Sequence, residues 1–195
     1  TGLVFVVNSP ASTMLTWKYV KGVKKLISSF PLPPYTSWRK EPIRDAIVSG
    51  DIETVTRRLD EDSSRVNFAD DDGARPLHYA AYNNELEIAR LLLERGAEVD
   101  ATTRDNYTAL HSAAYRGNVD IARLLVDNGA SLNAQGDGGN TPMLVAARSG
   151  SVEMVGCLLE QGGNLDDHTE HGSTLLHLAV WMGHAELVDI CSSKV

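Results

Sequence analysis

Apolar and polar residues recur along most of this chain with a fixed period of 33 residues. The segment RPLHYAA at 75–81 is followed by the related segments TALHSAA at 108–114, TPMLVAA at 141–147 and TLLHLAV at 174–180. In each period a polar turn precedes two stretches with apolar residues at helical spacing, joined by a short loop. Self-similarity at this period indicates stacked structural repeats.

Each period also carries the signals that start a helix. A residue that tolerates a left-handed backbone precedes every helix entry, and these residues are Gly73, Asn106, Gly139 and Gly172. Threonine at the N-cap and proline in the first turn, as in Thr141-Pro142, then favour helix initiation. We therefore predict a β-turn followed by a helix pair in each repeat.

Small and large apolar residues divide the predicted interior. Alanine pairs such as Ala80-Ala81 leave room for helices of adjacent repeats to approach, whereas runs such as Leu91–Leu93 fill the shared core. With 195 residues and 43% hydrophobic content, the chain can bury a substantial core along the axis of the stack.

A 33-residue period with this helix-opening pattern resembles the ankyrin repeat. The resemblance implies an all-α solenoid of helix-turn-helix units with β-turn or hairpin connections. It divides residues 41–195 into a cap at 41–69, repeats at 70–102, 103–135 and 136–168, and a truncated repeat at 169–195.

Three of the six histidines share one position in the repeat. They are His78, His111 and His177. In ankyrin repeats this imidazole is a structural hydrogen-bonding group that links neighbouring turns. Leu144 replaces it in the third full repeat, so we expect the network to be interrupted there. His168 and His171 lie close together, but without cysteines at ligand spacing they give little indication of zinc.

Charge divides the chain near residue 40. Residues 1–40 contain six Lys or Arg and no acidic residue, whereas residues 41–195 contain 12 basic and all 26 acidic residues. We expect 1–40 to be a basic, partly disordered leader, in which residues 14–30 have the pattern of a basic amphipathic helix. The acidic repeats disfavour nucleic acid as a partner, and membrane contact is expected only through residues 14–30.

No motif indicates an enzyme. The sequence lacks a phosphate-binding Gly-rich loop with a lysine, G-x-S-x-G and H-E-x-x-H. Acids such as Asp70–Asp72 are expected in solvated turns, whereas acid–base catalysis needs carboxylates in a cleft. Cys157 and Cys191 have no paired spacing and indicate a reducing compartment. We predict a non-enzymatic, monomeric protein of the cytoplasm or nucleus, with no metal and no cofactor.

The resemblance implies a protein-interaction module that uses turn tips and the inner faces of first helices. The residue four positions after the shared histidine position is, repeat by repeat, Val48, Tyr82, Tyr115, Arg148 and Trp181. Aromatic residues and arginine are typical of binding hot spots, although large side chains here could also pack on each other. We predict that the partner contacts Tyr82, Tyr115, Arg148, Trp181, Tyr107, Asp71, Asp72, Arg104 and Asp105.

Acidic turn tips favour a protein partner with a basic or mixed apolar and basic segment. Two alternatives stay open. Since the chain begins with Thr1 and reaches Val195 within a repeat, it could be the regulatory ankyrin domain of a larger enzyme, ubiquitin-ligase adaptor or channel. It could also be a membrane-targeted adaptor that uses residues 14–30. The resemblance further implies that Asn133 is a site for an asparaginyl hydroxylase.

Overall fold

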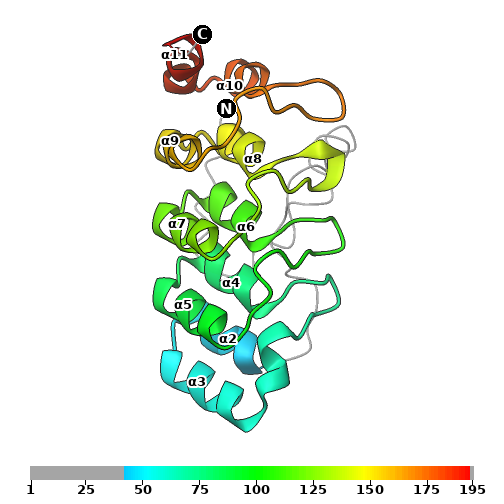
Figure 1. Ribbon diagram of the computed structural model, residues 1–195, viewed down its shortest axis with the longest axis vertical. Coiled ribbons are helices and arrows are strands. Elements are labelled where there is room, and N and C mark those ends of the chain that lie inside the picture. Colours follow the sequence, from blue (N-terminus) through cyan, green and yellow to red (C-terminus); the bar gives the residue numbers. More distant parts are fainter. Residues whose placement is uncertain (1–41, 194–195) are drawn as a thin grey trace, which may run out of the picture. The chain divides into compact units, whose positions relative to one another are not determined.

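The computed structural model describes residues 42–193, which form a succession of helix pairs (Figure 1). The first helices of the pairs are α2 (Pro42–Val48), α4 (Pro76–Asn83), α6 (Ala109–Arg116), α8 (Pro142–Ser149) and α10 (Leu175–Met182). The second helices are α3 (Ile52–Glu61), α5 (Leu86–Glu94), α7 (Val119–Asp127), α9 (Val152–Glu160) and α11 (Ala185–Ser193). The leader predicted at 1–40, with its helix at 14–30, lies outside the described residues.

The pairs stack in register, so that first helices form one column and second helices another (Figure 1). Each first helix from α2 to α8 contacts the next first helix along the chain. Two short 3₁₀ helices, η3 (Ser63–Asn67) and η4 (Asp137–Gly139), lie in the connections. Within residues 42–193, extended pairing outside these helices is limited to an isolated bridge between His168 and Thr174. The predicted all-α solenoid is confirmed.

Small and large apolar residues occupy different parts of the core. The paired alanines of α4, α6 and α8 have no exposed surface, which allows neighbouring first helices to lie close together. Leu92 and Leu125, from the second helices α5 and α7, are likewise fully buried. Removing such a leucine side chain leaves a cavity that costs about 2–5 kcal/mol of stability. The core is therefore shared between repeats and has no single centre.

The turns that end the first helices require a left-handed backbone. Asn84 has a φ of 62° and occupies the position that glycine holds in the other full repeats. At Gly150 a Cβ atom would lie only 2.5 Å from the imidazole of His184. That imidazole donates from Nε2 to the carbonyl of Arg148 at 3.1 Å, which ties the last described repeat to the preceding one.

A buried imidazole links successive turns. The backbone N–H of Thr108 donates to Nδ1 of His111 at 3.0 Å, so the ring proton must be on Nε2. Nε2 then donates to the carbonyl of Asn140, in the next turn, at 2.9 Å. His78 makes the same link to the carbonyl of Tyr107 at 3.0 Å. The structural role expected for these two histidines is confirmed.

Leu144 cannot make this link, and a different hydrogen bond holds the start of α8. The backbone N–H of Leu144 donates to the hydroxyl oxygen of Thr141 at 3.4 Å, which caps α8. The Thr141 hydroxyl donates in turn to the carboxylate of Asp167 at 2.8 Å. The histidine network stops at this repeat, as expected, but the start of α8 keeps a polar bond to the segment that leads into the last described repeat.

Burial lowers the pKa of His111 from its usual value near 6.5 to about 4. The unfolded chain therefore takes up the proton first, and the stability that the neutral ring contributes is lost as the pH falls below 6.5. We expect acidification from pH 7 to pH 5 to remove about 2 kcal/mol through His111. Urea unfolding curves at the two pH values measure this loss.

The substitution His111→Leu, which copies Leu144, provides the matched control. It removes the titrating ring, so the variant should lose about 2 kcal/mol less than the unsubstituted protein on acidification. An equal loss of stability in both proteins would contradict the assignment of this acid sensitivity to His111. Burial also lowers the pKa of His78, so part of the acid sensitivity should remain in the variant.

Candidate functional site

The first helices place five equivalent side chains near their carboxyl ends, and we call this set the ladder surface. Its members are Val48, Tyr82, Tyr115, Arg148 and Trp181. The stacking of the first helices in one column repeats the position from one pair to the next (Figure 1). The predicted ladder therefore exists as a geometric series, but its members differ in their surroundings.

Tyr82 and Tyr115 form the centre of the ladder surface. Their rings stack with centroids 6.2 Å apart and planes inclined by 16°. The guanidinium of Arg116, an exposed residue, lies 4.9 Å from the centroid of the Tyr82 ring. Both tyrosines are half-buried, so the stack holds the rings in place while leaving part of each accessible. We call these three residues the aromatic platform.

Arg148 and Trp181 continue the ladder surface differently. Arg148 donates to the side-chain oxygen of Asn140 at 3.0 Å and is half-buried, and burial lowers the pKa of its guanidinium. Trp181 is 67% exposed. Arg148 is thus partly engaged with its own repeat, whereas most of the indole surface is open to a partner.

Tyr107 has to be removed from the predicted partner contacts. It is only 6% exposed, and its ring meets the ring of His111 edge-on at 5.1 Å between centroids. A Cβ atom at Gly136 would lie 2.7 Å from the Tyr107 ring, so the next turn closes directly over it. Tyr107 supports the turn, and a partner cannot reach most of its surface.

The turn tips form a second surface, which we call the rim and define by Asp71, Asp72, Arg104 and Asp105. All are exposed except Asp72, which is half-buried. The N–H of Arg104 donates to the carbonyl of Asp72, and the N–H of Asp137 donates to that of Asp105, both at 2.9 Å. Backbone hydrogen bonds between repeats therefore hold the rim in place.

Asn133 is exposed in the turn that follows α7. Its counterpart Asp100 accepts the backbone N–H of Ser131 in the next repeat at 3.0 Å, and Asn67 accepts that of Glu98 at 2.9 Å. Among the described residues, the Asn133 side chain makes no corresponding bond. Its hydroxylation stays a prediction.

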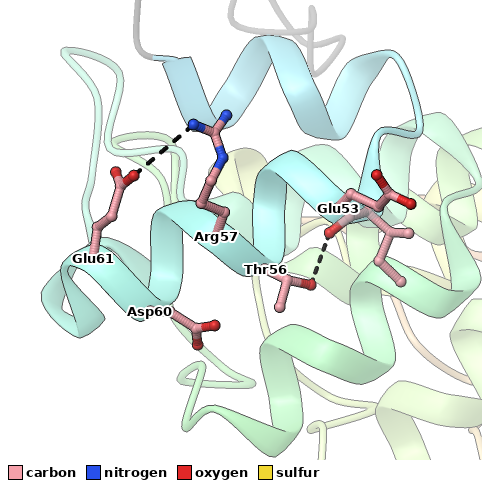
Figure 2. A pocket seen from close by; sticks show the side chains of 6 residues that line it. Glu53, Thr56, Arg57, Asp60 and Glu61 are labelled. Atoms are coloured by element: carbon pink, nitrogen blue, oxygen red, sulfur yellow. Dashed lines mark hydrogen bonds and ion pairs between the residues drawn. The ribbon is translucent and has the colours of Figure 1, made fainter.

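Figure 2 shows an open depression along α3, in the first helix pair. Its lining residues are Ile52, Glu53, Thr56, Arg57, Asp60 and Glu61. The Thr56 hydroxyl donates to the Ile52 carbonyl at 2.8 Å, and Arg57 forms a 4.0 Å ion pair with Glu61 (Figure 2). Its carboxylates lie exposed on the helix surface, so the depression does not provide the enclosed environment that acid–base catalysis needs.

Other reactive groups of the described region are dispersed or buried. In residues 42–193, no three His, Cys, Asp or Glu side chains converge to hold a metal ion. Cys157 and Cys191 are free thiols that are 3% and 8% exposed, and burial raises the pKa of both. No helix of the described part is long and apolar enough to cross a membrane.

Sequence reasoning missed Arg116, because it stands one position after the ladder series. Its counterparts Asn83, Ser149 and Met182 share no chemistry with it. The sequence contains one indication of its role, because an arginine directly after Tyr115 in a helix can reach the preceding repeat. Only the 33-residue stacking shows that Tyr82 lies within its reach.

Comparison with known proteins agrees with the stacked helix pairs. A family described as "Ankyrin repeats (3 copies)" matches residues 43–136 and 131–192. Ankyrin repeat domain-containing protein 49 of Bos taurus is 47% identical over 45 residues, which cover 23% of this chain and 19% of that protein.

The matches to two fungal relatives cover smaller shares of those proteins. Palmitoyltransferase akr1 of Schizosaccharomyces pombe is 38% identical over 53 residues, 27% of this chain and 8% of that protein. Palmitoyltransferase akr1 of Emericella nidulans is 31% identical over 58 residues, 30% of this chain and 8% of that protein. The chain thus spans less than a fifth of the length of these curated relatives. The match over residues 43–192 shows that this chain belongs to the ankyrin repeat family and carries its type of protein-interaction module.

Proposed function

We propose that this chain is a non-enzymatic adaptor that binds a protein partner across the ladder surface and the rim. The aromatic platform is the observation that carries the proposal. Tyr82, Tyr115 and Arg116 are held by ring stacking and by a cation–π contact before any partner arrives. Ordered aromatic and arginine side chains lose little conformational entropy on binding and are enriched in hot spots.

Trp181 extends the platform into a longer binding strip. Its 67% exposed indole lies at the same position of α10 as Tyr115 in α6. A partner that buries both residues must span the intervening repeat of α8, where Arg148 lies. We infer an elongated partner segment that runs along the stack.

The rim favours a basic or mixed apolar and basic segment. Asp71 and Asp105 are exposed at successive turn tips, and backbone bonds join each of these turns to the next one through the carbonyls of Asp72 and Asp105. Residues 41–195 have 26 acidic against 12 basic residues, so long-range attraction for a basic partner adds to the local contacts. The aromatic platform supplies the apolar part of the surface.

A non-enzymatic role is supported by the placement of the reactive groups. Both thiols lie in the core, the two turn-linking histidines are bonded on both ring nitrogens, and the Thr56 hydroxyl in the depression on α3 donates to a backbone carbonyl. Buried free thiols suit a reducing compartment, which supports a cytoplasmic or nuclear location. We propose a monomer that engages the partner without a cofactor.

A second candidate is that these repeats are the binding arm of a larger enzyme. Matches to proteins named palmitoyltransferases, of which the aligned segments are 8%, favour this candidate. The proposed binding surface would then recruit a substrate or regulator for that enzyme. Palmitoyl transfer by the natural full-length protein would support the candidate, and its absence would leave the adaptor role.

Replacing Tyr115 with alanine tests the platform. Because Tyr115 is central to the ladder surface, Tyr115→Ala should weaken binding by about 2 kcal/mol, roughly 30-fold in Kd. The partner is first captured on the immobilised chain and identified by mass spectrometry, and its affinity is then measured by calorimetry. Tyr115→Phe, which keeps the ring, should retain most of the affinity. An unchanged Kd with a lowered Tm for Tyr115→Ala would assign the residue to packing alone.

Reversing charge on the rim tests the chemistry of the partner. Asp71→Lys combined with Asp105→Lys should slow association several-fold and weaken its salt dependence, since exposed charges act mainly on the on-rate. Glu87→Lys combined with Asp120→Lys changes the net charge equally on the second helices α5 and α7. Stopped-flow association of the identified partner compares the two double variants. Equal rates for both would refute a specific role for the rim.

A further inference from the structure

The helix α10 exposes a face that the other first helices bury. Leu176 is 42% exposed, whereas its counterparts Leu77, Leu110 and Met143 are at most 2% exposed. Val180 is 62% exposed, and its alanine counterparts in α4, α6 and α8 have no exposed surface. We call Leu176, His177 and Val180 the end face.

The end face corresponds to the side on which each repeat receives the next one. The preceding helix α8 contacts α10, yet Leu176 and Val180 remain open. The same positions of α4, α6 and α8 are covered, and each of these helices contacts a following first helix. The following helix pair is therefore what covers this face at the junctions after α4, α6 and α8.

The hydrogen bonds that hold His177 are a second feature that α10 shares with α4 and α6 at the internal junctions. The Nδ1 atom of His177 accepts the backbone N–H of Thr174 at 3.3 Å and lies 2.8 Å from the Thr174 hydroxyl oxygen. His78 and His111 accept the equivalent backbone N–H, and each donates from Nε2 to a carbonyl 29 residues further along. Within the described residues, His177 makes no such onward bond. Its ring is held in the linking geometry and is exposed.

We infer that the end face is a stacking surface for one more ankyrin-type helix pair in the same 33-residue register. That pair would cover Leu176 and Val180 and offer a turn carbonyl to Nε2 of His177. The junctions after α4, α6 and α8 carry this inference, because each shows the same positions covered by the same kind of element. The inference concerns a surface other than the ladder surface and does not depend on the proposed partner.

Two other occupants fit less well. A second copy of the chain would bring together segments whose charged side chains are all acidic, because residues 169–193 contain Glu170, Glu186 and Asp189 but no Lys or Arg. A lone amphipathic helix could cover the apolar residues, but except in its last turn its backbone carbonyls accept hydrogen bonds within the helix. A helix pair with its preceding turn supplies both the apolar cover and the acceptor.

Val180 also limits the size of the residues that the incoming helix can place opposite it. The repeats of α4, α6 and α8 have alanine at this position, so the larger valine side chain takes up more of the space between two first helices than alanine does at those junctions. We therefore expect the incoming helix to place small residues against Val180. A bulky residue there would force the helices apart and weaken the bond to His177.

The test extends the full 195-residue chain with its own repeat. Appending residues 130–162 directly after Val195 preserves the register, since the carbonyl of Asn140 then stands 29 residues after His177. Stacking should raise the Tm by at least about 3 °C and slow amide hydrogen exchange in α10 at least about tenfold. An unchanged Tm and unchanged exchange would overturn the inference.

Val180→Asp provides the matched control. In the unextended chain it should change the Tm little, because the side chain is 62% exposed, whereas in the extended chain it should abolish the gain. Equal effects in both chains would contradict a stacking role. The inference would also fail if α10 already exchanged slowly in the unextended chain, or if light scattering showed a dimer that Val180→Asp converts to monomer. Either result would mean that another occupant covers the end face.

Discussion

The hydrogen bond from a buried imidazole to the next turn is the interaction on which the arrangement of the central repeats depends. Each of His78 and His111 fixes the start of its own helix through Nδ1 and the following turn through Nε2. An unsatisfied donor or acceptor here would cost about 1–3 kcal/mol in the buried interior. The bond therefore determines where the next turn, and with it the next pair of helices, can lie.

The position of the binding surfaces follows from that constraint. Because successive turns are tied by backbone and imidazole bonds, the rim residues and the ladder side chains recur at regular intervals. The rings of Tyr82 and Tyr115 meet because the junction between α4 and α6 brings them within stacking distance. A rigid scaffold thus orders side chains that single helices could not hold, which is the physical basis for binding without a deep pocket.

The 33-residue period was sufficient to predict the repeat architecture, the buried alanine pairs and the linking role of His78 and His111, because each depends on a position within the repeat. It could not predict contacts that depend on one side chain alone. Tyr107 was expected at the surface, but it lies beneath the next turn. Its counterparts Ala74, Asn140 and Ser173 share no residue type that indicates burial, although Ala74 and Asn140 are buried as well. The Thr141–Asp167 bond also depends on two residues that the repeat pattern does not pair.

The central claim is that a protein partner lies across the first helices and the turn tips. Hydrogen-exchange mass spectrometry of the chain with its captured partner tests this claim most directly. Protection should concentrate in the turn tips near residues 71–72 and 104–105 and at the carboxyl ends of α4 and α6. Protection confined to the second helices α5, α7 and α9, with the aromatic platform still exchanging freely, would contradict the account.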